Sequence, residues 1–412
     1  MSRFRVLLLL LIAASVGALN NGRPIFWGFA GAILALILIA VVWAWSGVNW
    51  VRLARRTNTR VAQAGQVLEE EFRFTNLSAL PKLWVEVRDQ STLPGHYASR
   101  VLGLIGGAQW RGWRARTRCA LRGRYQLGPV EVRSGDPLGI YQMTRKIAVI
   151  NTLLVYPATF PLRSFPLPAN RLPDGNASRR RTHYITTNAA GVRDYVSGDS
   201  INRIHWPSSA RRQRLMVKEF ELDPISDMWI AVDLYRAAHV GAVRMQDVER
   251  VDGERPFELP ASTEEYAISI AATCARYFLE QDRVLGLVMQ GEHRHVLGAE
   301  RGDRQFTKAM ETLSVVRADG ELPFERVLAS ETVSLSRGVT VVAISASLDT
   351  GWVKAIQGML RSGMRVVAIF IDATTFGANG TSAAVLAGLT ESGAVFRVVR
   401  YGDSINAALE SI

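Results

Sequence analysis

Cysteine is scarce in this chain of 412 residues. Its two cysteines, Cys119 and Cys274, are widely separated, which fits neither a disulfide framework nor a zinc-binding knuckle and is typical of a reducing compartment. Among the six histidines, His293 and His295 form the only close pair, and the sequence offers them no third ligand. We therefore expect two buried thiols, exposed histidines on a strand, and no bound metal.

The glycine-rich motifs of nucleotide-binding proteins are also missing. There is no Walker Gly-x4-Gly-Lys-Ser/Thr sequence, so we expect the chain not to hydrolyse ATP itself. Gly103 to Gly107 form a loop without the dinucleotide fingerprint. Without a low-complexity tract, a 48 % hydrophobic composition excludes global disorder, and the length predicts two or three folded units. No cofactor is expected.

Acidic residues are absent from the first 60 positions, which contain seven arginines. Residues 61–220 contain 24 basic and 11 acidic residues, whereas residues 221–412 contain 18 basic and 26 acidic ones. The formal net charge of +12 therefore comes from the N-terminal and middle parts. This distribution predicts docking of the middle to the acidic C-terminal part, or attraction of the middle to an anionic surface.

A long uncharged run predicts a membrane span within residues 1–50. Residues 25–48 carry no charge, and a helix of that length extends ~36 Å, enough to cross a bilayer. Tryptophans near its ends are typical of the headgroup interface. They are Trp27, Trp43, Trp45 and Trp50.

The earlier apolar run, Val6 to Leu19, is short for a span. It is either the hydrophobic region of a signal peptide or, as we favour, an uncleaved first helix of a hairpin. Arg52, Arg55, Arg56 and Arg60 follow the second span, whereas the connection contains only Arg23. The positive-inside rule then places the rest of the chain in the cytoplasm, beside the membrane that the hairpin crosses.

Short alternating stretches separated by turn residues predict a basic β-sandwich-like domain at residues 51–160. Arg114, Arg116 and Arg118 share one face of a strand because side chains alternate, and Arg122 and Arg124 extend this cluster. The face is either simply solvated or a platform for anionic lipid or an acidic partner. Few aromatic residues lie among these basic residues, and a membrane anchor would restrict access to DNA. Both observations argue against nucleic-acid binding.

The stretch Arg122 to Tyr141, RGRYQLGPVEVRSGDPLGIY, joins strand-like runs through Gly-Pro and Gly-Asp-Pro turns. Together with the hairpin it resembles the bacterial membrane-anchored family of domain of unknown function fifty-eight (DUF58). The resemblance extends over nearly the whole chain.

A second motif, GVRDYVSGDSINRIHWPSSARRQRLMVKEFEL, lies at residues 191–222 within the expected linker segment 161–226. It is similar to the second signature of DUF58 proteins. The signature and interaction residues expected in this segment are Tyr195, Gly198, Asp199, Arg203, His205, Trp206, Arg211 and Lys218.

Two interpretations of this motif stay open. Asp199 paired with Arg211 or Arg203, with His205 moving a proton, would suit an enzyme, although no activated nucleophile is evident. We favour a structural cluster that fixes the linker to the next domain, with Trp206 as its apolar centre. In either case Asp199 or Ser200 is expected to cap a short helix that Pro207 ends or kinks, with Ser208 or Ser209 capping the next turn.

Residues 227–412 alternate apolar strands with helices, which predicts a doubly wound (Rossmann-like) parallel sheet. The order of elements resembles a von Willebrand factor A-like (vWA-like) domain, whose Asp-x-Ser-x-Ser motif implies a Mg²⁺ site. Here the corresponding residues are Asp233, Leu234, Tyr235, Arg236 and Ala237.

Both serines of that motif are replaced, so even with help from Thr263 or Asp349 too few hard oxygen ligands remain. We expect a degenerate metal-site position at Asp233, with the aspartate acting as a cap or ion-pair partner. The mostly polar insertion at residues 238–262 is expected to overhang the same edge as a flap or partner contact.

These features favour a non-enzymatic scaffold or adaptor that is anchored in the membrane, with no catalytic residues. The resemblance implies a protein partner, a MoxR-type AAA+ ATPase, and a role in the assembly or maturation of envelope complexes. One alternative is an envelope-associated enzyme that uses the cluster of Asp199, His205 and Arg211. The other is a module that binds anionic lipid through Arg114, Arg116 and Arg118.

Overall fold

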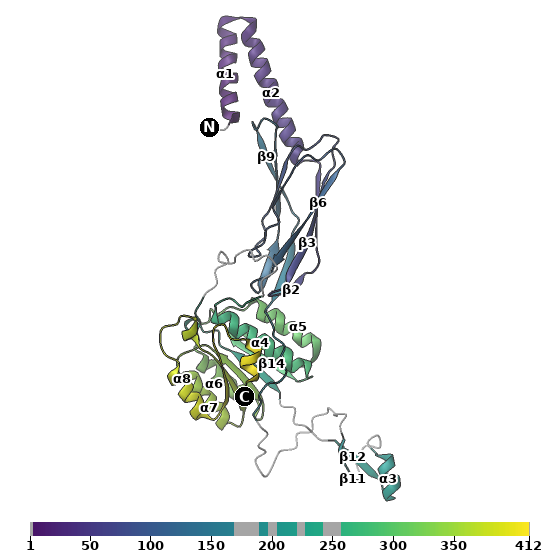
Figure 1. The fold of residues 1–412 in the computed structure, drawn as a ribbon, viewed down its shortest axis with the longest axis vertical. Coiled ribbons are helices and arrows are strands. Elements are labelled where there is room, and N and C mark those ends of the chain that lie inside the picture. The colour runs from purple at the N-terminus through teal and green to yellow at the C-terminus, as the bar shows by residue number, and fades with distance from the viewer. Residues whose placement is uncertain (1–2, 169–188, 197–203, 221–226, 242–256, 412) are drawn as a thin grey trace.

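The computed structural model describes residues 3–168, 189–196, 204–220, 227–241 and 257–411. It begins with two antiparallel helices, α1 (Arg3–Asn21) and α2 (Pro24–Val48), joined by a short turn (Figure 1). Both are long and apolar enough to cross a membrane. Most of their large side chains, such as Leu9 and Leu38, are exposed. The structure therefore confirms two apolar N-terminal helices and a possible membrane anchor.

Three sheets follow α2 in the elongated domain below the hairpin (Figure 1). The first has the order β1-β3-β6, the second β5-β4-β8-β9, and the third β2-β10-β7. The strand bounds are β1 Val51–Thr57, β2 Val61–Gln63, β3 Val67–Asn76, β4 Val85–Asp89, β5 Arg100–Leu102, β6 Trp110–Arg118, β7 Gly123–Leu127, β8 Val130–Gly135, β9 Gln142–Ile147 and β10 Asn151–Tyr156.

A shared core lies between the first two sheets. Strand β3 alternates strictly between exposed and buried residues, which gives the sheet one apolar face. Phe72 of β3 stacks on Trp113 of β6 with ring centroids 5.0 Å apart. Both rings join a cluster with Val87 of β4 and Val132 of β8. The packing of two sheets face to face over one core is the arrangement of a β-sandwich.

The end of α2 is held against this domain. The Lys82 ammonium, in a side chain that is almost fully buried, donates to the carbonyl of Ser46 in the last turn of α2. Burial lowers the pKa of Lys82. Arg145 of β9 donates to Asn49 Oδ1 at 3.2 Å, just after the helix. The last carbonyls of a helix lack partners within it, and Lys82 satisfies one of them. Together the two contacts hold the end of α2 against the β-sandwich.

A small hairpin unit follows the first domain in the sequence. Strands β11 (Ala189–Asp194) and β12 (Met216–Phe220) pair antiparallel, and α3 (Trp206–Arg212) lies between them in the chain. The strand expected after Leu215 is thus confirmed. Gly198, Asp199 and Arg203 lie outside the described residues.

The C-terminal part contains a six-stranded sheet of order β15-β14-β13-β16-β17-β18. All neighbouring strands are parallel except the edge strand β15, which is antiparallel to β14. The strands are β13 Met228–Val232, β14 Leu285–Gln290, β15 Arg294–Glu300, β16 Thr340–Ser345, β17 Arg365–Ile371 and β18 Val395–Val399.

Two hydrophobic clusters cover the two faces of this sheet. One contains residues of α4, α5 and α9, and the other contains residues of α6, α7 and α8. The expected doubly wound arrangement is therefore confirmed at the level of a parallel-rich sheet with helices on both faces. The helices are α4 Thr263–Glu280, α5 Gly302–Val315, α6 Phe324–Ser334, α7 Gly351–Arg361, α8 Ala383–Ser392 and α9 Ile405–Glu410.

Candidate functional site

The strand order of the six-stranded sheet reverses at β13, which lies beside both β14 and β16. In open α/β sheets, ligands bind at such a switch point, outside the carboxyl ends of the strands. Two residues mark that point here: Asp233, which directly follows β13, and Ser345, the last residue of β16. The carboxyl ends of β13 and β16 are therefore the candidate site.

Asp233 is buried, and both of its carboxylate oxygens accept hydrogen bonds from the protein. Oδ1 accepts from the backbone amide of Tyr235 at 2.9 Å, and Oδ2 accepts from Ser345 Oγ at 2.6 Å. Burial raises the pKa of Asp233, and His239 together with these hydrogen bonds offsets only part of that increase. The carboxylate therefore acts as a cap that ties β13 to β16.

The other oxygens proposed for a metal site have partners of their own. Thr263 Oγ1 lies 3.1 Å from His239 Nδ1 and accepts from the amide of Val240 at 2.9 Å. Asp349 accepts from the amide of Gly351 at 3.1 Å. Among the described residues, no three His, Cys, Asp or Glu side chains lie close enough to share a metal ion. His239 Nε2 lies 2.8 Å from the Asp233 carbonyl, which can only accept, so Nε2 donates.

A surface hollow of about 310 Å³ lies over the segment that follows Asp233 in the chain. Tyr235, Arg236, Gly320 and Glu321 line it. The backbone of Arg236 donates to the Gly320 carbonyl at 2.9 Å, which joins the segment after β13 to the loop before α6. The guanidinium of Arg236 also donates to the Asp319 carbonyl at 3.3 Å. The hollow thus presents one basic and one acidic side chain on a hydrogen-bonded backbone.

The arginines of β6 do not form the unpaired basic surface that a lipid-binding platform would require. Trp113, Ala115 and Thr117 are buried and Arg114 and Arg116 are exposed, as the alternation predicts. Arg114 pairs with Glu71 and Arg116 with Glu69 of the neighbouring β3, each at 2.8 Å. Arg118, at the end of β6, is half-buried. The glutamates compensate much of the positive charge that the sequence suggests.

Arg122 does not extend that cluster, because it is fully buried at the junction with the α/β domain. Its guanidinium donates to Glu264 Oε1 at 2.6 Å and to Glu265, both in the first turn of α4. It also donates to the carbonyls of Leu313 and Val316 at 3.0 and 2.9 Å. One side chain thereby joins the first domain to two segments of the second. The sequence shows Arg122 as basic but gives no sign of its partners.

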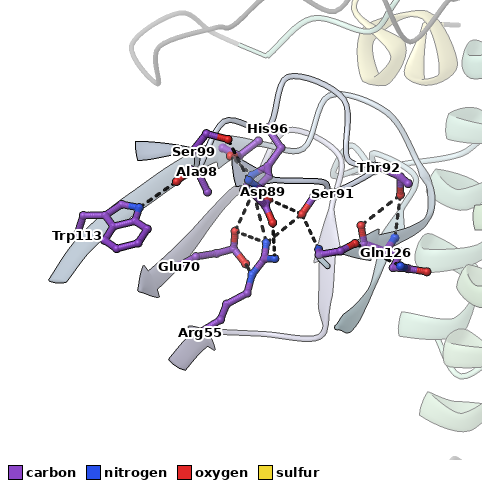
Figure 2. Close-up of polar contacts among 12 residues, drawn as sticks. Arg55, Glu70, Asp89, Ser91, Thr92, His96, Ala98, Ser99, Trp113 and Gln126 are labelled. Carbon is purple, nitrogen blue, oxygen red and sulfur yellow. Dashed lines mark hydrogen bonds and ion pairs between the residues drawn. The ribbon is translucent and has the colours of Figure 1, made fainter. Parts of the chain in front are cut away.

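Figure 2 shows a second buried ionic cluster, within the β-sandwich. Arg55 makes a two-point contact with Glu70 at 2.8 and 2.9 Å and reaches Asp89 Oδ1 at 3.0 Å. His96 Nε2 lies 2.9 Å from Asp89 Oδ2, to which Ser91 donates at 2.5 Å. Burial would raise the pKa of Asp89, but the hydrogen bonds and the nearby positive charges lower it below its ordinary value. The cluster joins strands β1, β3 and β4.

Among the signature residues that the structure describes, His205 caps a short helix. His205 is the residue before α3, and its Nδ1 accepts from Ser208 Oγ at 2.7 Å and from the Ser208 amide at 3.3 Å. Pro207 therefore lies in the first turn of α3, where proline is favoured, and the expectation that it ends a helix is wrong. The serines do not cap this helix; His205 does.

Trp206 is 63 % exposed, so the expectation that it forms an apolar centre is wrong. Trp206 is the first residue of α3, whereas the buried apolar residues of this unit are Ile204, Met216 and Val217. Tyr195 is half-buried and its amide donates to the Leu215 carbonyl at 2.9 Å, whereas Arg211 is exposed in the last turn of α3. Lys218 lies on β12, opposite Val192 of β11.

Comparison with known proteins agrees with the resemblance seen in the motifs. Residues 191–374 match the DUF58 family model. That family is described as protein of unknown function DUF58. The chain is also 24 % identical to the uncharacterized protein YeaD of Bacillus subtilis (strain 168) over 341 residues, which cover 80 % of this chain and 78 % of that protein. Both matches support the DUF58 family.

Solved structures give only weak similarity. The CARDB domain of the PF1109 protein from Pyrococcus furiosus is 12 % identical, with 26 % of this chain and 86 % of that chain covered and a TM-score of 0.19. The alkylpurine DNA glycosylase AlkC of Pseudomonas fluorescens is also 12 % identical, with coverage of 31 % and 39 % and a TM-score of 0.19. Matches at this level carry no argument about this chain.

Proposed function

We propose that the chain is a membrane-anchored cytoplasmic scaffold that binds a protein partner through its α/β domain. The observation that carries this proposal is a pair of contacts made by buried side chains, one between the hairpin and the β-sandwich and one between the β-sandwich and the α/β domain. Lys82 fixes α2 to the β-sandwich, and Arg122 fixes the sandwich to α4. A series of rigid connections of this kind presents the α/β domain at a set distance from the bilayer, which is what a scaffold requires.

The cytoplasmic orientation is supported by the arginines around the hairpin. Arg3 and Arg5 precede the apolar part of α1, and exposed Arg52 and Arg56 follow α2, whereas the turn contains only Arg23. Both cysteines are free and buried, and burial raises the pKa of Cys119 to about 11. Unpaired thiols are typical of a reducing compartment.

The vWA-like interpretation is supported by the sheet order and by the antiparallel edge strand β15. In this proposal the hollow beside Asp233 replaces the metal-dependent contact of such domains and binds a protein directly. The expected partner is the MoxR-type AAA+ ATPase that the DUF58 resemblance implies. The envelope-assembly role rests on the same resemblance.

One observation favours an enzyme as the second candidate. The hydrogen bond from Ser208 Oγ to His205 Nδ1, at 2.7 Å, has the length expected of a nucleophile and its base. Because the same nitrogen accepts from the Ser208 amide, helix capping accounts for the contact as well. Loss of a measurable turnover in His205→Ala, with the fold retained, would favour the enzyme.

Site-specific photocrosslinking in native membranes tests the scaffold. A crosslinking amino acid at Arg236, in the hollow, should yield an adduct with a MoxR-type AAA+ ATPase, identified by mass spectrometry. Arg337 provides the matched control because it is an exposed arginine just before β16, at the amino ends of the parallel strands and so away from the hollow. Equal crosslinking from both positions, or none to an ATPase, would reject the proposed partner and surface.

A further inference from the structure

Exposed apolar side chains gather at the end of the β-sandwich that adjoins the hairpin. We call these five residues the apolar rim, and each of them is between 47 % and 57 % exposed. They are Trp50, Leu77, Leu80, Trp110 and Leu138. Large apolar side chains grouped in this way on a protein surface commonly mark an interaction site.

Backbone and side-chain contacts place several rim residues at this end of the domain, although they are distant in the sequence. The amide of Leu77 donates to the Trp50 carbonyl at 2.7 Å. Trp110 is opposite Thr75 in the pairing of β3 with β6, and Thr75 is two residues before Leu77. Leu138 lies in the β8–β9 turn, where its carbonyl accepts from Arg3 of α1 at 3.0 Å. The rim therefore includes a residue that contacts the start of α1 and a residue that closely follows the end of α2. Figure 1 shows these two helix ends at the top of the β-sandwich.

The rim is fixed relative to the hairpin. Besides the Lys82 contact to the last turn of α2, Phe4 of α1 packs on Tyr141 with ring centroids 5.3 Å apart. Trp45 of α2 packs edge-on against Trp50 at 4.8 Å. Wherever the hairpin is placed in a bilayer, the rim is placed with it.

The length of α2 gives the depth of the rim. Its 25 residues extend ~38 Å at ~1.5 Å each, which exceeds the ~30 Å hydrocarbon core of a bilayer. The last turn of α2, and the rim beside it, therefore lie at the level of the lipid headgroups. That is the layer in which tryptophan rings are enriched and in which apolar side chains reach the acyl boundary.

The charges around the rim suit the same layer. The guanidinium of Arg73 lies over the Trp110 ring at 4.1 Å, so a cation accompanies an exposed indole. Arg3 adjoins Leu138. The nearby carboxylate of Asp136 is buried and accepts from the amides of Leu138 and Tyr141 at 2.9 and 2.6 Å. The rim thus presents arginine and apolar groups, whereas this carboxylate faces inward.

We propose that the apolar rim of the β-sandwich inserts into the headgroup layer of the bilayer that α1 and α2 cross, as a second membrane contact. This inference rests on the proposed membrane anchoring. It places the lipid contact at the rim and away from Arg114 and Arg116, which pair with glutamates. The sandwich would then contact the membrane directly, in addition to its attachment through α1 and α2.

Fluorescence quenching of the full chain in phosphatidylcholine nanodiscs tests this contact. The two native cysteines are fully buried, so single cysteines at Leu80 and Leu138 can be labelled selectively with an environment-sensitive dye. Ile150→Cys is the matched control, because Ile150 is an exposed apolar residue in the β9–β10 connection at the far end of the same domain. Leu38→Cys, in the middle of α2, reports whether the hairpin is in the bilayer.

Lipids with a nitroxide on the headgroup should quench the dye at Leu80 and Leu138 and leave it bright at Ile150. Lipids with a nitroxide on the acyl chain should quench the dye at Leu38. Quenching at Leu38 combined with rim positions that behave like Ile150 would overturn the rim contact alone. An unquenched Leu38 position would overturn the membrane anchor and the rim contact together.

Discussion

Arg122 of the β-sandwich donates through Nη2 to Glu264 Oε1 at the start of α4, with a separation of 2.6 Å. The arginine side chain is completely buried, whereas that of Glu264 is 21 % exposed. Arg317 adds a second cation 3.5 Å from the same carboxylate oxygen. A basic residue of the middle part is thus bound by acidic residues of the C-terminal part, which is the electrostatic docking that the charge distribution predicts.

Replacing Arg122 with methionine should destabilise the junction between the two domains. Removing one partner of a buried pair leaves the other charge unpaired, at a cost of about 3–5 kcal/mol. We expect a lower unfolding midpoint and faster proteolysis between the domains. Arg114→Met is the matched control, since its ion pair is exposed and contributes little. Equal stability of the two variants would contradict a structural role for Arg122.

Acid should weaken the β-sandwich through Asp89. Its folded-state pKa lies below the ordinary value of 3.8, so its contribution to stability is present above pH 3.8 and is lost as pH falls through the folded pKa. Asp89→Asn should therefore be less stable at pH 7, with a smaller loss of stability below pH 3.8. Thermal unfolding of both proteins over a series of pH values measures this. An unchanged acid dependence in the variant would show that other carboxylates dominate.

Asp233→Asn should leave the α/β domain as stable as the wild type at neutral pH, or more stable. Burial raises the pKa of Asp233, so the folded protein keeps the proton on this carboxyl up to a higher pH than the unfolded chain does. The contribution of this group to the free energy of unfolding is fully present below pH 3.8, its ordinary pKa, and is lost as pH rises through the higher pKa of the folded state. Asparagine keeps an acceptor without the buried charge.

The same variant tests the metal-site expectation. Both oxygens of Asp233 accept hydrogen bonds from the protein, so millimolar Mg²⁺ should not raise the melting temperature of wild type or variant. A rise with Mg²⁺ in the wild type that is absent in Asp233→Asn would place a divalent ion at this position and overturn the degenerate-site interpretation.

His205→Ala and Ser208→Ala should loosen α3 locally. Loss of a capping side chain costs about 1 kcal/mol, and α3 has only seven residues. Hydrogen exchange should accelerate in residues 206–212 and stay unchanged in the six-stranded sheet. Arg211→Ala is the control, because this exposed residue makes no part of the cap. Unchanged exchange in both cap variants would argue against capping as the role of His205.

Local patterns in the sequence predicted the parts of the fold that depend on local physics. An uncharged run gives α2, continuous apolar runs give β13, β16 and β17, and the alternation around Trp113 gives the buried face of β6. The sequence does not determine the role of Pro207, because proline both ends helices and begins them and the choice depends on His205 as the cap. Nor does it determine the exposure of Trp206, because aromatic character does not decide burial at the end of a helix.

The sequence alone determined the apolar hairpin, the succession of strands and helices, and the presence of tyrosine and alanine, which are not metal ligands of the expected kind, two and four residues after Asp233. These follow from side-chain polarity and spacing over a few residues. Only the tertiary structure decided which ionic groups meet: Arg122 with Glu264 and Glu265, Arg55 with Glu70 and Asp89, and Asp233 with Ser345. The physical reason is that ion pairs and hydrogen bonds require approach within about 3 Å, and chain folding sets that distance between residues far apart in sequence.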